Sequence, residues 1–272
     1  MFAIGKRGGD SSGLMKVPSP RLGTALQAAS FKEHKRIVQV LLNQGAEVDT
    51  EGGTHGNAIQ DAFFSGHENI VRILLEQGAD VNASGGLHGN ALQAASFRGH
   101  EILVQILLDH GADPNVQDGG YGSALQAASS GGHTRIVKML VGKGASLDVR
   151  DYVYGYTPIS LAADKGFNDI VRFPFGTERN GADLKSHCGR TPLFFAAKNG
   201  HGVLVKARLS SGSASPDQKD HYGSSPLSIV VRHGHMEVVK ILVATFSVTY
   251  DDHDNYGRSI LWWANQSGNA EV

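Results

Sequence analysis

The stretch "GNALQAASFRGHE", residues 89–101, recurs along the chain and decides the fold. A near copy, "GNAIQDAFFSGHE", begins 33 residues earlier at Gly56, and "GSALQAASSGGHT" begins 33 residues later at Gly122. The Asn, Gln, Arg and His of this stretch have the chemistry of a reaction centre. Because the pattern returns at a fixed period, it indicates a structural unit rather than a single catalytic site.

The repeat covers most of the 272 residues. One column of the repeat steps by 33 residues and then by 34: Ala25, Ala58, Ala91, Ala124, Pro158, Pro192, Pro226 and Ile260. We therefore predict seven complete units and an eighth that stops at Val272. Residues 1–20 are expected to form a flexible leader, and residues 21–272 the array.

Each unit carries the signals of two helices. The residue before each first helix is of an N-cap type: Thr24, Asn57, Asn90, Ser123, Thr157, Thr191, Ser225 and Ser259. A glycine is expected to end most first helices: Gly66, Gly99, Gly132, Gly166, Gly200 and Gly234. Another ends most second helices: Gly45, Gly78, Gly111, Gly144, Gly181 and Gly212. Such a unit cannot bury its apolar face alone, so the pattern predicts an all-α solenoid of stacked units.

Departures from the pattern are few. The second helix of the fifth unit, expected at 170–181, contains Pro174, which should shorten it or replace it by a loop. Whether that irregularity is a hinge or an imperfection stays open. Glu33 stands where other units have glycine. In the last unit Leu261, Trp262 and Trp263 are expected to have little to cover them.

The totals exclude several classes of protein. Lys plus Arg is 25 and Asp plus Glu is 26, which gives no support for an obligatory nucleic-acid or membrane partner. The single cysteine, Cys188, excludes an internal disulfide framework and suits a reducing compartment. We find neither a signal-peptide core nor a membrane span. The expectation is a cytoplasmic protein, with the nucleus as the alternative, that is monomeric or part of a longer chain.

Three stretches carry a family resemblance: "YTPISLAADKGFNDIV" (156–171), "RTPLFFAAKNGHGVLV" (190–205) and "SSPLSIVVRHGHMEVV" (224–239). With "GADVN" at 78–82 and "GADPN" at 111–115, they resemble the ankyrin repeat, whose landmarks are T-P-L, A-A, G-H and G-A-D. The "ALQAAS" units are similar to the variant common in long fungal ankyrin arrays. The resemblance covers residues 21–272 in register.

This resemblance implies a scaffold that binds another protein. In the family, the first helices and hairpin-like loops line a concave surface, and no residue is catalytic. No catalytic residue, cofactor or metal is therefore assigned. The alternative function is a sensor or regulatory segment of a larger signalling protein, such as a fungal protein that joins an ankyrin array to a nucleoside-triphosphatase.

Two columns at the end of the first helix face the concave surface in this family. The residues expected to bind a partner there are Phe31, Lys32, Phe64, Ser65, Phe97, Arg98, Ser130, Lys165, Lys198 and Arg232. The phenylalanines form either an aromatic hot spot or a structural strip that lies against neighbouring loops. At the loop tips His55, His88, Tyr121 and Tyr154 are either partner contacts or simply exposed turn residues.

Six histidines occupy the G-H position: His34, His67, His100, His133, His201 and His235. Stacked helices lie about 10 Å apart, whereas zinc needs all its ligands within about 2 Å of one centre. We therefore expect these histidines to be structural caps rather than metal ligands. His233 and His235 are close in sequence, but the intervening glycine is expected to point them in different directions.

Overall fold

The computed structural model describes residues 23–86, 89–120, 122–173, 183–212, 214–245, 249 and 252–268. The described residues form helices and no strand. The helices are α1 Ala25–Phe31, α2 Lys35–Asn43, α3 Ala58–Ser65, α4 Glu68–Glu76, α5 Ala91–Arg98, α6 Glu101–Asp109, α7 Ala124–Gly131, α8 Thr134–Gly142, α9 Pro158–Lys165, α10 Asn168–Arg172, α11 Pro192–Lys198, α12 Gly202–Ser210, α13 Pro226–His233, α14 Met236–Thr245 and α15 Ile260–Ser267.

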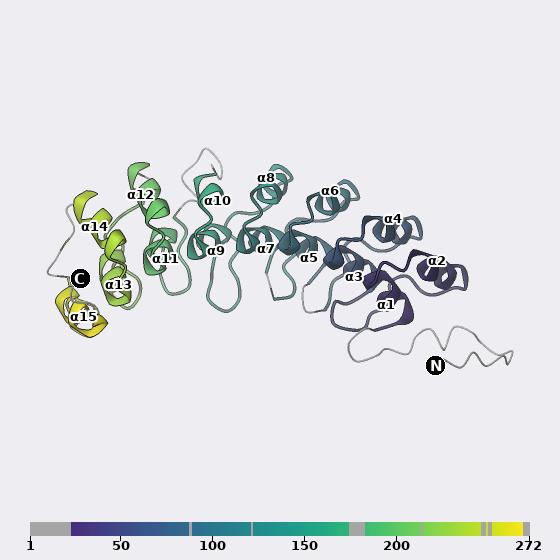
Figure 1. Cartoon of the computed structure of the whole chain (residues 1–272), viewed down its shortest axis with the longest axis horizontal. Coiled ribbons are helices and arrows are strands. Elements are labelled where there is room, and N and C mark those ends of the chain that lie inside the picture. The colour runs from purple at the N-terminus through teal and green to yellow at the C-terminus, as the bar shows by residue number, and fades with distance from the viewer. Residues whose placement is uncertain are drawn as a thin grey trace. The chain divides into compact units, whose positions relative to one another are not determined.

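The chain forms two compact units, Met1–Ala124 and Leu125–Val272. From here on they are called unit 1 and unit 2, and the 33- or 34-residue units of the sequence are called repeats. In unit 1 the first helices α1, α3 and α5 pack in one row, and each also packs against its own second helix, α2, α4 or α6. Unit 2 has the same plan, with α9, α11, α13 and α15 in its first-helix row and α10, α12 and α14 packed along one side of that row, above it in Figure 1. In both units the loops between repeats extend past the first helices, away from the second helices.

N-caps fix where the first helices begin. Seven predicted caps have extended backbone and a side-chain oxygen that accepts from the third helical N–H: Thr24, Asn57, Asn90, Thr157, Thr191, Ser225 and Ser259. Ser123 directly precedes α7, as predicted. The hairpin-like loops are tightened by isolated antiparallel bridges, for example between Gly52 and Gly56 and between Asp118 and Gly122.

Glutamines join one repeat to the loop of the next. The Gln60 side chain accepts from the backbone N–H of Asn57 through Oε1 at 2.8 Å. Its Nε2 donates to the carbonyl oxygens of Gly89 at 2.7 Å and Ala83 at 3.1 Å, both in the following loop. Three more glutamines at this position make such forward bonds: Gln27 to Gly52 and Gly56, Gln93 to Val116 and Gly122, and Gln126 to Tyr156. These contacts hold the loop tips beside the first helices.

The G-H histidines also join neighbouring repeats. His67 Nε2 donates to the carbonyl oxygen of Phe31 at 3.0 Å, and the same bond recurs from His100 to Phe64, from His201 to Asp164 and from His235 to Lys198. The structural interpretation is confirmed for these four, but the helix that is capped is the first helix of the preceding repeat. The helices that follow His67, His100 and His201 receive no side-chain cap from these histidines.

Helix-ending glycines adopt the left-handed backbone conformation that the sequence predicts. Gly66, Gly99, Gly166 and Gly234 are the αL caps of α3, α5, α9 and α13. Among the described residues Glu33 is the single non-glycine residue with positive φ, at 59°, and it occupies the equivalent place after α1. A side chain in this conformation costs about 1–2 kcal/mol.

Replacing Glu33 by Gly is expected to raise the free energy of unfolding by about 1 kcal/mol, because glycine adopts positive φ without the clash of a Cβ. The Glu33 carboxylate lies 3.6 Å from His67 Nδ1, but it is half exposed, so little is lost with it. Urea unfolding would measure the change. Lys32→Gly, at a φ of −98°, is the control and should not stabilise the protein; equal effects of the two changes would contradict the explanation.

Two sequence expectations concern local irregularities. Helix α10 has five residues where α8 and α12 have nine, so the predicted shortening is confirmed. Pro174 lies outside the described residues, and the hinge hypothesis stays untested.

The expectation that Trp263 is uncovered was wrong. Trp263 is 7% exposed, because Arg232 and Arg258 lie 4.3 and 4.4 Å from its ring centroid. Trp262 is exposed, as expected.

Candidate functional site

Aromatic rings from two first helices and one loop form a stack in unit 1. The His55 ring lies between Phe31 at the end of α1 and Phe64 near the end of α3. Its centroid is 5.6 Å from that of Phe31, with an interplanar angle of 14°, and 4.6 Å from that of Phe64, at 22°. Such stacked pairs contribute about 0.5–1.5 kcal/mol beyond their burial.

Two cations bracket this stack. Lys32 Nζ lies 5.3 Å from the centroid of Phe31, and the guanidinium of Arg98 lies 4.9 Å from that of Phe64. We call these five residues, Lys32, Phe31, His55, Phe64 and Arg98, the unit 1 ladder. Both phenylalanine rings are partly exposed, and Lys32 and Arg98 are exposed. Phe31 and Phe64 therefore do lie against a loop residue, as the structural interpretation predicted, and both remain partly exposed.

A buried carboxylate orients the central ring. His55 Nδ1 donates to Asp61 Oδ1 at 2.5 Å. The position of Asp61 in the repeat is occupied by alanine in the neighbouring repeats, at Ala28, Ala94 and Ala127. Asp61 is 6% exposed. Burial raises the pKa of the Asp61 carboxyl, and the hydrogen bond and charge of His55 act in the opposite direction. His55 is thus held by a specific contact rather than being a freely exposed turn residue.

The raised pKa of Asp61 predicts a pH-dependent effect of Asp61→Ala. A carboxyl whose folded pKa exceeds its ordinary value of 3.8 contributes most stability below that value and loses it as the pH rises through the folded pKa. The stability of the variant relative to the wild type should therefore increase as the pH rises above 3.8 and through the folded pKa of Asp61. Urea unfolding across this range would measure it. Asp61→Asn should show the same trend, and a pH-independent difference would contradict this account.

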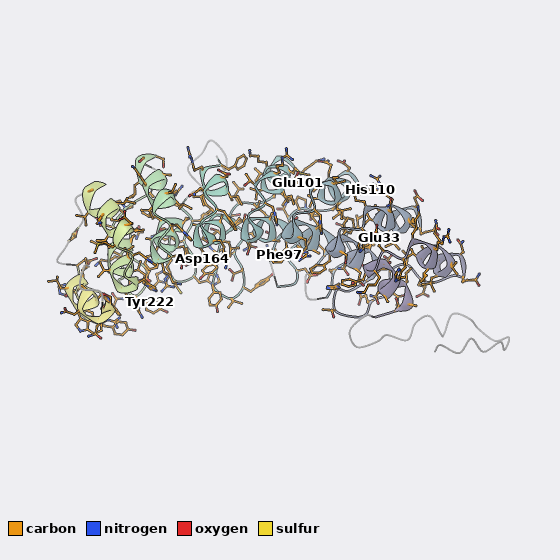
Figure 2. The ribbon with its side chains drawn as sticks, in the orientation of Figure 1. Glu33, Phe97, Glu101, His110, Asp164 and Tyr222 are labelled. Atoms are coloured by element: carbon orange, nitrogen blue, oxygen red, sulfur yellow. The ribbon has the colours of Figure 1, made fainter. Side chains whose placement is uncertain are left out.

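Other predicted residues of unit 1 are placed less fully. Phe97 is partly exposed at the end of α5, one position from Arg98 (Figure 2), and Ser65 is partly exposed at the end of α3. His88 and Tyr121 lie outside the described residues. The structure therefore brings together five of the predicted residues: Phe31, Phe64 and Arg98 on α1, α3 and α5, Lys32 directly after α1, and His55 from a loop.

Unit 2 presents a different set of side chains at the same positions. Lys165 and Arg232 are exposed, and Ser130 and Lys198 are partly exposed. Asp164, labelled in Figure 2, accepts a hydrogen bond from Asn199 Nδ2 at 2.8 Å. Tyr154 is 60% exposed at its loop tip, and its ring stacks on that of Tyr156. No contact brings these predicted residues into one cluster; they form a row with one or two members per repeat.

The loops of unit 2 also contain arginine–aromatic pairs that were not predicted from the sequence. The Arg190 guanidinium lies 5.1 Å from the centroid of Phe194 and 5.8 Å from that of exposed Tyr222, and its Nε donates to Asp220 at 3.0 Å. Arg258 lies 4.6 Å from the centroid of Tyr256 and donates to Asp254 at 2.7 Å. The signal was present as the recurring "D-x-Y-G" of these loops at 220–223 and 254–257.

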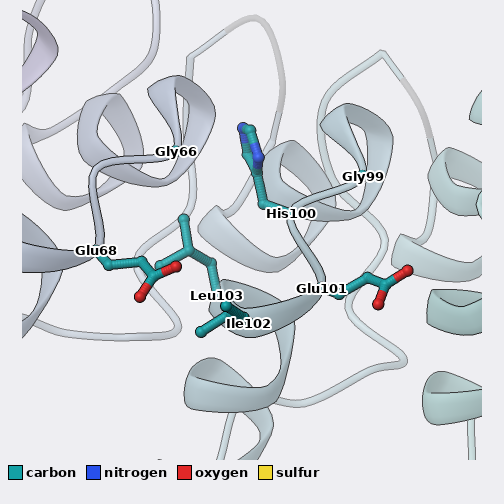
Figure 3. A pocket seen from close by; sticks show the side chains of 7 residues that line it. All are labelled: Gly66, Glu68, Gly99, His100, Glu101, Ile102 and Leu103. Atoms are coloured by element: carbon teal, nitrogen blue, oxygen red, sulfur yellow. The ribbon is translucent and has the colours of Figure 1, made fainter.

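A hollow of about 320 Å³ lies at the turns between first and second helices in unit 1, lined by Gly66, Glu68, Gly99, His100, Glu101, Ile102 and Leu103 (Figure 3). Its imidazole, His100, is already bonded to Phe64. Within the described residues no three His, Cys, Asp or Glu side chains are grouped so that they could hold a metal ion. The rings of His233 and His235, expected to point apart, stack at 6.1 Å instead.

Comparison with known families decides the identity of this array. The family model described as ankyrin repeats (3 copies) matches residues 13–85, 91–175, 175–243 and 193–272. The chain belongs to the ankyrin repeat family. The predicted all-α ankyrin-repeat fold is thereby confirmed. Ankyrin repeats are generally protein–protein interaction modules and are typically non-catalytic.

The search of curated proteins found no match to the ankyrin array. Among the helices that the structure describes, none combines the length and the apolar character needed to cross a membrane.

Proposed function

We propose that this ankyrin array is a non-catalytic module that binds a protein partner through the face formed by its first helices and loop tips. The unit 1 ladder is the observation that supports this most strongly. Aromatic side chains and arginine are enriched at protein interfaces, and here they are arranged in advance by His55, Asp61 and three helices. A preorganised surface loses little entropy when a partner binds.

Variants of the full chain test this proposal. Phe31, Phe64 and Phe97 changed together to Ser remove the aromatic surface. The matched control changes Ile37, Ile102 and Val203 to Ser, since these are exposed apolar residues on second helices, at 50%, 56% and 73%. Proteins retained by the immobilised wild type and variants would be quantified by mass spectrometry, with circular dichroism to check folding.

The proposal expects a set of proteins that the wild type and the second-helix control retain and that the phenylalanine variant loses. The phenylalanine variant should remain folded, although loss of the stacked pairs lowers its stability by about 1–3 kcal/mol. Retention of the same proteins by all three arrays would refute the assignment of the binding face. Retention of no protein above a bead control would refute the binding function.

A further inference from the structure

In unit 2 the first-helix face carries a row of cations with one member in each of three successive repeats. Lys165 is the last residue of α9, Lys198 is the last residue of α11, and Arg232 lies one residue before the end of α13. Because α9 packs on α11 and α11 on α13, the row follows directly from the stacking. We propose that this row binds an acidic, extended peptide segment of a partner protein, an inference that rests on the proposed function.

The acidic groups beside this row are already used within the protein. Asp220 is paired with Arg190, and its side chain is fully buried. Asp254 is paired with Arg258, and its side chain is 1% exposed. Each also accepts backbone N–H bonds of its own loop. Asp164, the one acid in the row's two columns, accepts from the Asn199 amide. Asp220 and Asp254 are buried and Asp164 is partly exposed, so the three cations of the row outnumber its one partly exposed acid.

The three cations of the row, by contrast, are not paired with carboxylates of the protein. Within the described part of unit 2, none of Lys165, Lys198 and Arg232 forms an ion pair. Arg232 is instead fixed in place against the Trp263 ring, at 4.3 Å. The whole chain has a net charge of −1, so this concentration of positive charge is local. Complementarity of charge therefore favours an acidic partner.

The repeat spacing indicates how the acids of the partner are arranged. Packed helices lie about 8–10 Å apart, so Lys198 and Arg232, which occupy the same position of α11 and α13, are separated by about that distance at the backbone, and Lys165 lies one position further along α9. A polyproline II segment rises about 3.1 Å per residue with three residues per turn, which places every third side chain on one face about 9 Å from the last. An Asp or Glu at positions i, i+3 and i+6 would therefore meet Lys165, Lys198 and Arg232 in turn.

Tyrosines border this face on the loop side. Tyr154 is 60% exposed and Tyr222 is 46% exposed, the latter labelled in Figure 2. Their hydroxyls can donate to carboxylates or to backbone carbonyls, and their rings bury area at low entropic cost. Because an extended segment exposes its whole backbone, such donors on the loop side add contacts that a compact anion could not use.

Selection from a phage-displayed library of random 12-residue peptides on the full chain tests the inference. We expect the selected peptides to share acids spaced three residues apart. A synthetic selected peptide would then be titrated by fluorescence anisotropy against the wild type and against K165E/K198E/R232E. This variant should lose at least about tenfold in affinity, and wild-type affinity should fall as salt is raised.

Two controls make the result specific. K138E/K206E/K240E changes the charge by the same amount on exposed positions of α8, α12 and α14, and its affinity should stay within about twofold of the wild type. The same peptide with Gln and Asn for its acids should bind at least about tenfold more weakly. Besides these two controls, a 12-nucleotide DNA oligonucleotide would be tested for binding, because nucleic acid is the other polyanion that a basic row could attract.

Each failure has a separate meaning. Selected peptides that lack acids but lose affinity on first-helix substitution would overturn the acidic-segment inference and leave the proposed function standing. Equal losses in the two charge-reversal variants, or tighter binding of the oligonucleotide than of the peptide, would also overturn the inference. If no peptide is selected, the inference is overturned, and the proposed function then depends on the outcome of the protein-retention experiment.

Discussion

Replacing Gln60 by Ala is expected to lower the free energy of unfolding by about 3–5 kcal/mol, one of the largest effects of any single change in this chain. The Gln60 side chain is fully bonded: it accepts from the Asn57 N–H and donates to Gly89 and Ala83. Gln60 is 1% exposed. The substitution would leave two buried backbone groups, the Asn57 N–H and the Gly89 carbonyl, without this partner, each costing about 1–3 kcal/mol, and it would also release the partly buried Ala83 carbonyl.

Urea unfolding and amide hydrogen exchange would measure this effect. Exchange at the Asn57 amide should accelerate strongly, since its hydrogen bond is lost. Gln60→Leu fills the space without replacing the hydrogen bonds and should be almost as destabilising, which separates the polar loss from the cavity. The matched control is Gln105→Ala, an exposed glutamine on α6 that bonds only a neighbouring Asp109 in the described contacts. A loss below about 1 kcal/mol for Gln60→Ala would contradict the role of the glutamine.

The effect of Gln60 also shows where sequence reasoning stops. The N-caps and helix-ending glycines were predictable because each follows a rule that acts within a few residues. Gln27, Gln60, Gln93 and Gln126 recur in register just as clearly. Their function lies 23 to 30 residues ahead, in the loop of the next repeat, and no local rule reports such a contact. In later repeats Ser160 and Ser228 occupy this position and only cap their own helix.

The candidate site was predictable in part for the same reason. Alignment to the repeat placed Phe31, Phe64 and Arg98 on one face, because the face of a helix residue follows from its register. It could not place His55, whose position depends on a loop with positive φ at Gly53 and Gly56. It also missed Asp61, a polar exception in an alanine column, whose significance appears only when the His55 ring lies beside it.

Replacing Gly66 by Ala is expected to destabilise unit 1 by about 2–5 kcal/mol, through two separate effects. Gly66 has a φ of +82°, where a Cβ costs about 1–2 kcal/mol. A Cβ at this position would also lie 2.8 Å from Cε1 of His100, whose ring covers the turn while it caps the preceding first helix. Overpacking of that kind costs about 1–3 kcal/mol more.

The chain supplies a control that separates these two effects. Gly78 has a φ of +83°, and a Cβ there would meet no atom within 4 Å. Gly78→Ala should therefore show the backbone cost alone, about 1–2 kcal/mol in urea unfolding. In a His100→Ala background, Gly66→Ala should cost no more than Gly78→Ala does, because the clashing ring is gone. If Gly66→Ala stays as costly without the imidazole, the His100 ring is not what requires glycine at this turn.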